Sequence, residues 1–93
     1  MNLPVNYETL TWQERREVRN QYVKIQGNLC HYCKSPLDKE PPDRITIIWI
    51  DESLFPTNFF KNPVHLHRNH DTGMTIGAVH CKCNATLWQY HGE

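Results

Sequence analysis

The sequence predicts a small α+β domain held together by a bound metal ion, and three observations lead to this prediction. The chain has 93 residues, enough for one domain (1–93) with a modest hydrophobic core. Its N-terminal part has the apolar spacing of a helix, whereas later segments carry the short alternating runs of strands. Four cysteines and six histidines supply metal ligands, and small cores are often completed by a metal.

Charge and hydropathy argue against two classes of protein: strongly basic nucleic-acid-binding domains and membrane or secreted proteins. Ten basic and ten acidic side chains give a net charge of zero, so the chain lacks the basic excess typical of nucleic-acid-binding domains. A bound metal would still supply local positive charge. The sequence has neither an apolar run of membrane length nor the pattern of a signal peptide, so we expect a cytoplasmic chain without membrane contact. In a reducing cytoplasm, cysteines bind metals more often than they form disulfides.

Residues 11–26 are predicted to form the N-terminal helix. Thr11 and Glu14 have the spacing of a capping box, and Gly27 follows the last helical residue. The apolar residues of one face are Val18, Tyr22 and Ile25. Basic residues of the same segment are Arg15, Arg16 and Arg19. We interpret these arginines as a solvated face, with contact to phosphate as the alternative.

The central segments are shorter and less regular. Residues 27–37, "GNLCHYCKSPL", have the turn residues of a hairpin knuckle around a cysteine pair. The β-branched run of residues 44–50, "RITIIWI", predicts a strand. Residues 51–63 read as an irregular loop with three phenylalanines: Phe55, Phe59 and Phe60. These rings either pack on the core or cover an opening, and the sequence leaves both alternatives open.

The C-terminal part predicts a strand–strand–helix unit. Residues 64–67 and 74–79 read as strands, and the turn "HDTG" at 70–73 joins them into a hairpin. Residues 81–91 then have helical spacing with a polar face. The expected order is therefore helix, knuckle, strand, and a final ββα unit over residues 64–91.

The cysteine spacing predicts a structural zinc site. Cys30 and Cys33, with two residues between them, can grip one tetrahedral ion from a tight turn. His80 and Cys83 share this spacing and are expected to complete the set. Cys81 is the alternative to His80, although one intervening residue converges less readily on a common ion. A redox dithiol or disulfides are the other interpretations, but no βαβ context for a dithiol is visible.

A second group of residues predicts an open metal site. His65 and His67 point to one face of a strand, because side chains alternate along it. Asn84 lies one residue after a predicted zinc ligand, where a helix packed on the hairpin would approach His67. An imidazole and a carboxamide oxygen, with water and phosphate, suit a hard divalent ion. The alternative is a pair of surface histidines and a helix-capping asparagine.

Three stretches of this chain together resemble a known family. "CHYC", "HLHRNHDTG" and "IGAVHCKCN" follow the order and spacing of the HNH nucleases, also called ββα-metal nucleases, and are nearest to the phage endonuclease VII-like branch. The resemblance implies a zinc-stapled ββα-metal fold and hydrolysis of DNA to a 5′-phosphate and a 3′-hydroxyl. It also implies a phage or prophage origin, a bacterial cytoplasm, and phage packaging proteins as further partners. Thr75 lies near the position of the family's central asparagine, which favours this branch.

The resemblance also assigns roles to single residues. His67 and Asn84 take the positions of the two ligands to a Mg²⁺ or Mn²⁺ ion, and His70 matches a further active-site histidine. Arg68 occupies the general-base position, but a guanidinium cannot be deprotonated in a protein. We therefore expect a base-deficient form that cuts slowly, since a general base contributes roughly 10²–10⁴ in rate. The alternative is that His70 or His65 takes over as base.

A function of another class also fits the residues. A zinc knuckle could bind DNA or a protein partner without catalysis. An open position flanked by His67 and Asn84 favours the enzyme over this binding module. The dimerisation elements of endonuclease VII relatives are not visible in this sequence, so we expect a monomer.

Overall fold

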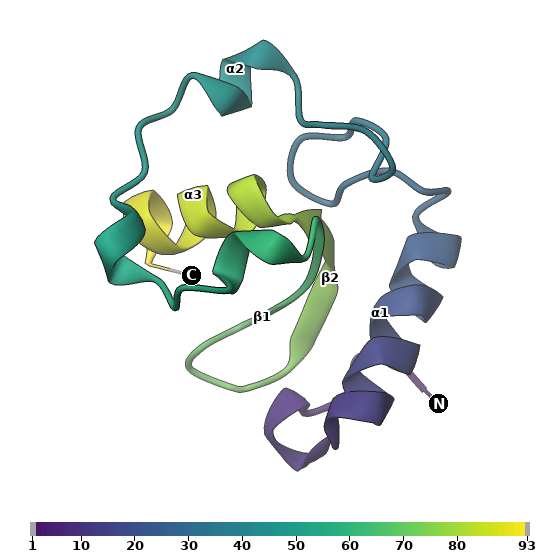
Figure 1. The fold of residues 1–93 in the computed structure, drawn as a ribbon. Helices are drawn as coiled ribbons and strands as arrows, with labels where there is room; N and C mark the ends of the chain where they lie inside the picture. Colours follow the sequence, from purple (N-terminus) through teal and green to yellow (C-terminus); the bar gives the residue numbers. More distant parts are fainter. Residues whose placement is uncertain (1, 93) are drawn as a thin grey trace.

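The computed structural model describes residues 2–92, and Figure 1 shows an α+β arrangement around one β-hairpin. Two longer helices, α1 and α3, lie on different sides of this hairpin, and a third, short helix interrupts the loop between them in sequence. The elements in chain order are η1 (Tyr7–Thr9), α1 (Trp12–Ile25), α2 (Asp43–Thr46), η2 (Glu52–Leu54), η3 (Phe59–Lys61), β1 (Val64–Arg68), β2 (Thr75–His80) and α3 (Cys81–His91).

The predicted C-terminal ββα unit is confirmed. β1 and β2 pair antiparallel from Val64 opposite His80 to Arg68 opposite Thr75, with a register irregularity between His67 and Arg68. α3 begins directly after the last residue of β2, so its first turn lies beside the start of β1. This junction places residues of the hairpin and of the helix's first turn next to each other.

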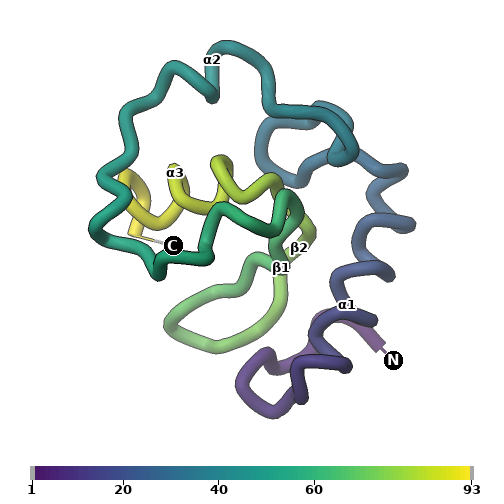
Figure 2. The backbone as a smooth tube through the Cα atoms, in the orientation of Figure 1, coloured from purple at the N-terminus to yellow at the C-terminus, as the bar shows by residue number. Residues whose placement is uncertain are grey.

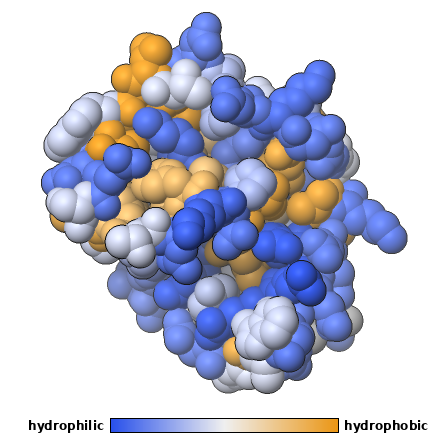
Figure 3. Space-filling model, in the orientation of Figure 1, coloured by the Kyte–Doolittle hydropathy of each residue, from blue (hydrophilic) through white to orange (hydrophobic). Residues whose placement is uncertain are grey.

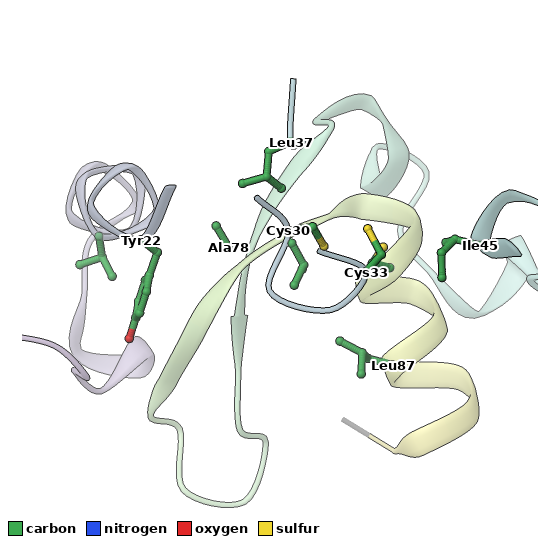
Figure 4. Close-up of a cluster of buried hydrophobic side chains, with 10 residues drawn as sticks. Tyr22, Cys30, Cys33, Leu37, Ile45, Ala78 and Leu87 are labelled. Carbon is green, nitrogen blue, oxygen red and sulfur yellow. The ribbon is translucent and has the colours of Figure 1, made fainter. Parts of the chain in front are cut away.

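The predicted N-terminal helix is confirmed with its cap. The Thr11 hydroxyl accepts from the Glu14 amide at 3.2 Å, and the Glu14 carboxylate accepts from the Thr11 amide at 2.9 Å. Tyr22 faces the hairpin, as Figure 4 shows, whereas Ile25 is 71% exposed, against the expectation of one continuous apolar face. The next residue, Gln26, contacts the hairpin instead, because its carboxamide both donates to and accepts from the backbone of Ala78.

The hydrophobic core includes three of the four cysteines. It fills the space between α1, the hairpin, the knuckle and α3, and Figure 4 shows seven of its residues labelled. The buried residues of this cluster are Val18, Tyr22, Cys30, Cys33, Leu37, Ile45, Ala78, Val79, Cys83 and Leu87. Because the cysteines occupy the centre of so small a core, packing and any metal binding depend on the same side chains.

The predicted strand over residues 44–50 is wrong. The chain forms α2 there, and residues 47–50 after it are a turn and irregular backbone. Pro42 stands at the N-cap position in extended conformation, and an acidic residue follows in the first turn, which suits a helix start. Ile47 and Trp49 are 79% and 69% exposed. Within residues 2–92 the sheet consists of β1 and β2, and the β-branched run pairs with neither strand; β-propensity alone does not make a strand.

The segment from α2 to β1 passes along α3. Figure 2 shows it as an arc that leaves the knuckle and returns to the hairpin past the C-terminal half of α3. Several hydrogen bonds attach it to α3: the Tyr90 hydroxyl donates to the Trp49 carbonyl at 2.6 Å, the Gln89 side-chain amide nitrogen donates to the same carbonyl at 3.3 Å, and the Asp51 amide donates to the Gln89 side-chain oxygen at 2.9 Å. On the face that Figure 3 shows, hydrophobic side chains occur in small groups among hydrophilic ones.

Candidate metal centre and adjacent basic cavity

The four residues that the spacing predicted as ligands converge in the structure. The side-chain ligand atoms of Cys30, Cys33, His80 and Cys83 all lie within 4.8 Å of one another, and all four residues are buried. Nδ1 of His80 lies 3.3 Å from Sγ of Cys33 and 3.7 Å from Sγ of Cys83. A tetrahedral zinc ion would hold sulfur and nitrogen ligands about 3.6 Å apart. The cluster could therefore hold a structural metal ion.

Local backbone geometry explains why each pair converges. In the knuckle, the Cys30 amide donates to the Ser35 carbonyl at 2.8 Å, and Lys34 adopts a positive φ of 64° that closes the turn. Both thiols of the CxxC pair thus point from one tight turn. His80 is the N-cap of α3 and Cys83 lies in its first turn, so the helix start brings this second pair to the same point.

Hydrogen bonds of His80 determine which nitrogen faces the sulfurs. Its Nε2 lies 2.9 Å from the carbonyl oxygens of both Pro36 and Lys39, which can only accept. Nε2 therefore carries the proton and Nδ1 keeps its lone pair toward the cluster. Metal-binding histidines are commonly oriented by such a bond from the second nitrogen to a carbonyl. Cys81, the alternative ligand, is only half-buried and lies outside the cluster.

The sulfur atoms of Cys30 and Cys83 differ in acidity. A hydrogen bond with Cys83 lowers the pKa of Cys30 to about 4, against the opposing effect of burial. The same hydrogen bond and burial raise the pKa of Cys83. Burial also raises the pKa of Cys81. A thiolate is the metal-binding form of cysteine, so the cluster already stabilises one ligand in this form.

A cavity of about 600 Å³ opens between α1, β1 and the first turn of α3. Four of the chain's five arginines line it: Arg15, Arg16, Arg19 and Arg68. The other lining residues are Tyr7, Trp12, Phe59, Asn62, Val64, His65, Leu66 and Asn84. None of these lining residues is acidic. A chain without net charge therefore concentrates positive charge at one cavity, as an anion-binding site requires.

Two of the arginines are held in place by the N-terminal segment. The guanidinium groups of Arg15 and Arg68 lie 3.9 and 4.0 Å from the ring centre of Tyr7. Nε of Arg68 is 3.3 Å from the carboxylate of Glu8, which is largely exposed. The Arg15 guanidinium donates to the Tyr7 carbonyl. Arg68 thus lines the cavity as a fixed cation and not as a base.

His65 and Asn84 meet at the edge of this cavity. Nδ1 of His65 lies 3.1 Å from Nδ2 of Asn84, and Nε2 of His65 lies 2.9 Å from the carbonyl oxygen of Phe59. The ring of Phe59 packs against the His65 ring, with 4.6 Å between the ring centres. Burial lowers the pKa of His65 below its usual value of 6.5, which keeps the imidazole neutral at pH 7.

The other predicted site residues lie elsewhere. His67 is opposite Gly77 in the hairpin, is 3% exposed, and is not among the lining residues of the cavity in the described part of the chain. His70 is exposed in the turn between the strands. The sequence predicts His67 as the partner of Asn84, whereas the structure places His65 in contact with Asn84. The hairpin register indicates this contact. Val64 pairs with His80, the last residue before α3, so the start of β1, with His65, lies nearest to Asn84 in the first turn of the helix.

Comparison with family models, with curated proteins and with solved structures found no match to this chain. Among the described residues, no helix has the length and apolar character needed to cross a membrane.

Proposed function

We propose that this chain is a metal-dependent DNA endonuclease or nickase with an HNH, or ββα-metal, site. One observation carries the proposal: the arginine-lined cavity opens beside Asn84, at the junction of a β-hairpin with the helix that follows it. Phosphodiester backbones are recognised mainly by arginine and lysine, and planar guanidinium groups bind phosphate oxygens in pairs. The motif order noted in the sequence supports the same function.

In this proposal the buried cluster of Cys30, Cys33, His80 and Cys83 binds zinc. Three thiolates and one imidazole are a common ligand set for structural zinc, and four protein ligands leave no position for substrate. Its role is to attach the knuckle to the β2–α3 junction. Because Asn84 follows Cys83 directly, the zinc would also hold the start of the open site in place.

The residues of the open site have separate roles in the proposal. Asn84 would hold a divalent ion such as Mg²⁺ or Mn²⁺ at the cavity. The family resemblance implies His67 as a second ligand, but this side chain is 3% exposed and does not line the cavity, so the site as proposed depends on Asn84. Such an ion stabilises the charge that develops on the scissile phosphate and on the leaving oxygen. Arg15, Arg19 and Arg68 would bind flanking phosphates. Since Arg68 cannot accept a proton from water, we expect slow cleavage.

A plasmid-nicking assay tests this function. The zinc-loaded chain is incubated with supercoiled plasmid and Mn²⁺, with and without chelator. We expect slow nicking that requires Mn²⁺ and is lost in Asn84→Ala. Asn58→Ala is the matched control, because Asn58 is exposed, lies outside the cavity and makes no side-chain cap. Nicking that persists in Asn84→Ala would refute the proposed site.

The second candidate is a zinc-stapled module that binds DNA without cutting it. The fixed position of Arg68 at the cavity favours this candidate, since the same contacts bind phosphate whether or not water is activated. Fluorescence anisotropy with a DNA duplex at several salt concentrations separates the two. If the chain binds DNA without cutting it, Arg19→Ala should reduce the affinity for DNA and lower the slope of log K against log salt concentration by about one. No nicking should then occur with any divalent ion.

A further inference from the structure

A largely exposed tryptophan stands among the arginines of the basic cavity. Trp12 is the first residue of α1 and lines the cavity, yet 66% of it is exposed. Arg16, one helical turn later and also exposed, holds its guanidinium 5.8 Å from the centre of the Trp12 ring. Thr11 and Glu14 make the capping box that starts α1, so the helix start does not depend on this indole. Most of Trp12 is therefore accessible to a ligand that enters the cavity.

The cations of α1 continue along the face that Trp12 begins. Trp12, Arg16 and Arg19 follow one another at intervals of four and three residues, which places them on one face of the helix. This face covers about 10 Å along the helix axis. Arg68 of β1 lines the same cavity. A row of cations beside exposed aromatic surface is the combination by which proteins bind single-stranded nucleic acid.

The form of DNA that fits this cavity follows from where the bases lie. In a duplex the base faces are stacked on one another, and a protein in a groove meets only the base edges. A strand with unpaired bases exposes these faces together with its phosphates, and aromatic side chains stack on them. A cavity of about 600 Å³ has the size that encloses one small organic ligand, so it can take a nucleotide but not a duplex. Phosphates alone would account for the arginines but not for the exposed indole beside them.

We propose that the basic cavity binds single-stranded DNA, with an unpaired base stacked on Trp12 and the neighbouring phosphates on Arg16 and Arg19. This inference deepens the proposed function by naming the form of DNA, and it rests on that function's assignment of phosphates to the arginines. The binding itself needs no divalent ion, because guanidinium groups neutralise phosphates directly and release the counterions of the strand.

Trp49 provides a matched comparison within the chain. It is 69% exposed, about as much as Trp12, and lines a second cavity of about 380 Å³ beside the C-terminal half of α3. The described residues that line this second cavity include neither lysine nor arginine. We therefore expect Trp49→Ala to leave DNA binding unchanged. This variant separates the role of Trp12 from any general effect of an exposed indole.

Fluorescence anisotropy with a labelled oligothymidylate tests the inference, with the zinc-loaded chain and no added divalent ion. Trp12→Ala should weaken binding by roughly 5–150-fold, and Trp12→Phe should recover part of the affinity because it keeps a stacking ring. An indole carries no charge, so Trp12→Ala should leave the slope of log K against log salt concentration unchanged. Arg19→Ala should lower this slope by about 0.7.

Two ligands without free base faces sharpen this test. One is an abasic strand of the same length, and the other is a duplex with both ends closed by linkers that carry no base. Trp12→Ala should bind each of them as tightly as the wild type does. An equal loss of affinity for the oligothymidylate and the abasic strand would overturn the inference. Unchanged affinity of Trp12→Ala for the oligothymidylate, or no binding of it by the wild-type chain, would also overturn it.

Indole emission gives a second readout that serves where Trp12→Ala fails to fold. In a Trp49→Phe/Trp88→Phe chain, Trp12 is the single tryptophan. Saturating oligothymidylate should quench its emission, whereas the abasic strand should not; emission that the oligothymidylate leaves unchanged contradicts stacking on Trp12.

Failure of the inference and failure of the proposed function are distinguishable. If the chain nicks plasmid in a manner that depends on Asn84, while Trp12→Ala binds oligothymidylate as the wild type does, the inference fails and the proposed function stands. If binding follows the expectations but no divalent ion supports nicking, the proposed function fails and the inference stands.

Discussion

Replacing Cys83 by serine should damage this protein far more than replacing Cys81, although the two cysteines lie in the same turn of α3. Cys83 is fully buried in the four-residue cluster, whereas Cys81 is half-buried and outside it. Apparent zinc-binding free energies of about 10–16 kcal/mol, divided over four ligands, give about 2.5–4 kcal/mol for one ligand. The whole domain is expected to be stable by only about 5–14 kcal/mol.

This difference is measurable as a melting temperature. For a domain of this size, 1 kcal/mol corresponds to about 4–8 °C, so Cys83→Ser should lower the melting temperature by roughly 10–30 °C. Cys81→Ser should shift it by no more than a few degrees, because it removes no ligand. Far-UV circular dichroism follows unfolding, and elemental analysis counts zinc per chain. We expect one zinc in the wild type and in Cys81→Ser, and reduced zinc in Cys83→Ser.

Equal destabilisation by the two serine variants would refute the assignment of ligands. It would mean that Cys81 and not His80 belongs to the set. A His80→Ala variant decides between these cases, since loss of zinc on this change requires His80 as a ligand. Full zinc retention in all three variants would instead show that the cluster is not the zinc site.

Three further predictions follow from single contacts. Arg68→His should raise the nicking rate by roughly 10²–10⁴, whereas Arg68→Gln, which supplies neither a base nor a phosphate-binding cation, should not raise it; an unchanged rate in Arg68→His would mean that residue 68 is not at the base position. Thr75→Val should cost about 1–3 kcal/mol in urea unfolding, because the buried Tyr22 hydroxyl and the Val5 amide lose their partner; a Tyr22→Phe/Thr75→Val double variant should be less than additive. The pKa of His65 lies below 6.5 in the folded chain because burial penalises its charge, so the unfolded chain binds more protons below about that pH. Stability should therefore fall on acidification through pH 6.5, and less steeply in His65→Gln, which a thermal melt series between pH 5 and pH 8 measures.

Local sequence patterns were enough for the elements whose hydrogen bonds are local. The capping box of Thr11 and Glu14 defines the start of α1, because both of its bonds span three residues. The hairpin over β1 and β2 follows from two short strands and a turn. The two pairs of ligands, Cys30 with Cys33 and His80 with Cys83, follow from their equal spacing. Such features depend on neighbours along the chain and are readable without knowing the fold.

Tertiary structure decided what depends on partners distant in sequence. In the described residues the β-branched run at 44–50 pairs with neither strand of the sheet. On the outer side of β2, the backbone of Ala78 is already hydrogen-bonded to Gln26 and His31. The convergence of both ligand pairs on one point required the knuckle to dock at the β2–α3 junction. Which histidine meets Asn84 was also decided there, because strand register and the start of α3 together select His65. The sequence alone determined which residues could bind a metal; only the packing of α3 and of the loop over residues 51–63 determined which of them face the cavity.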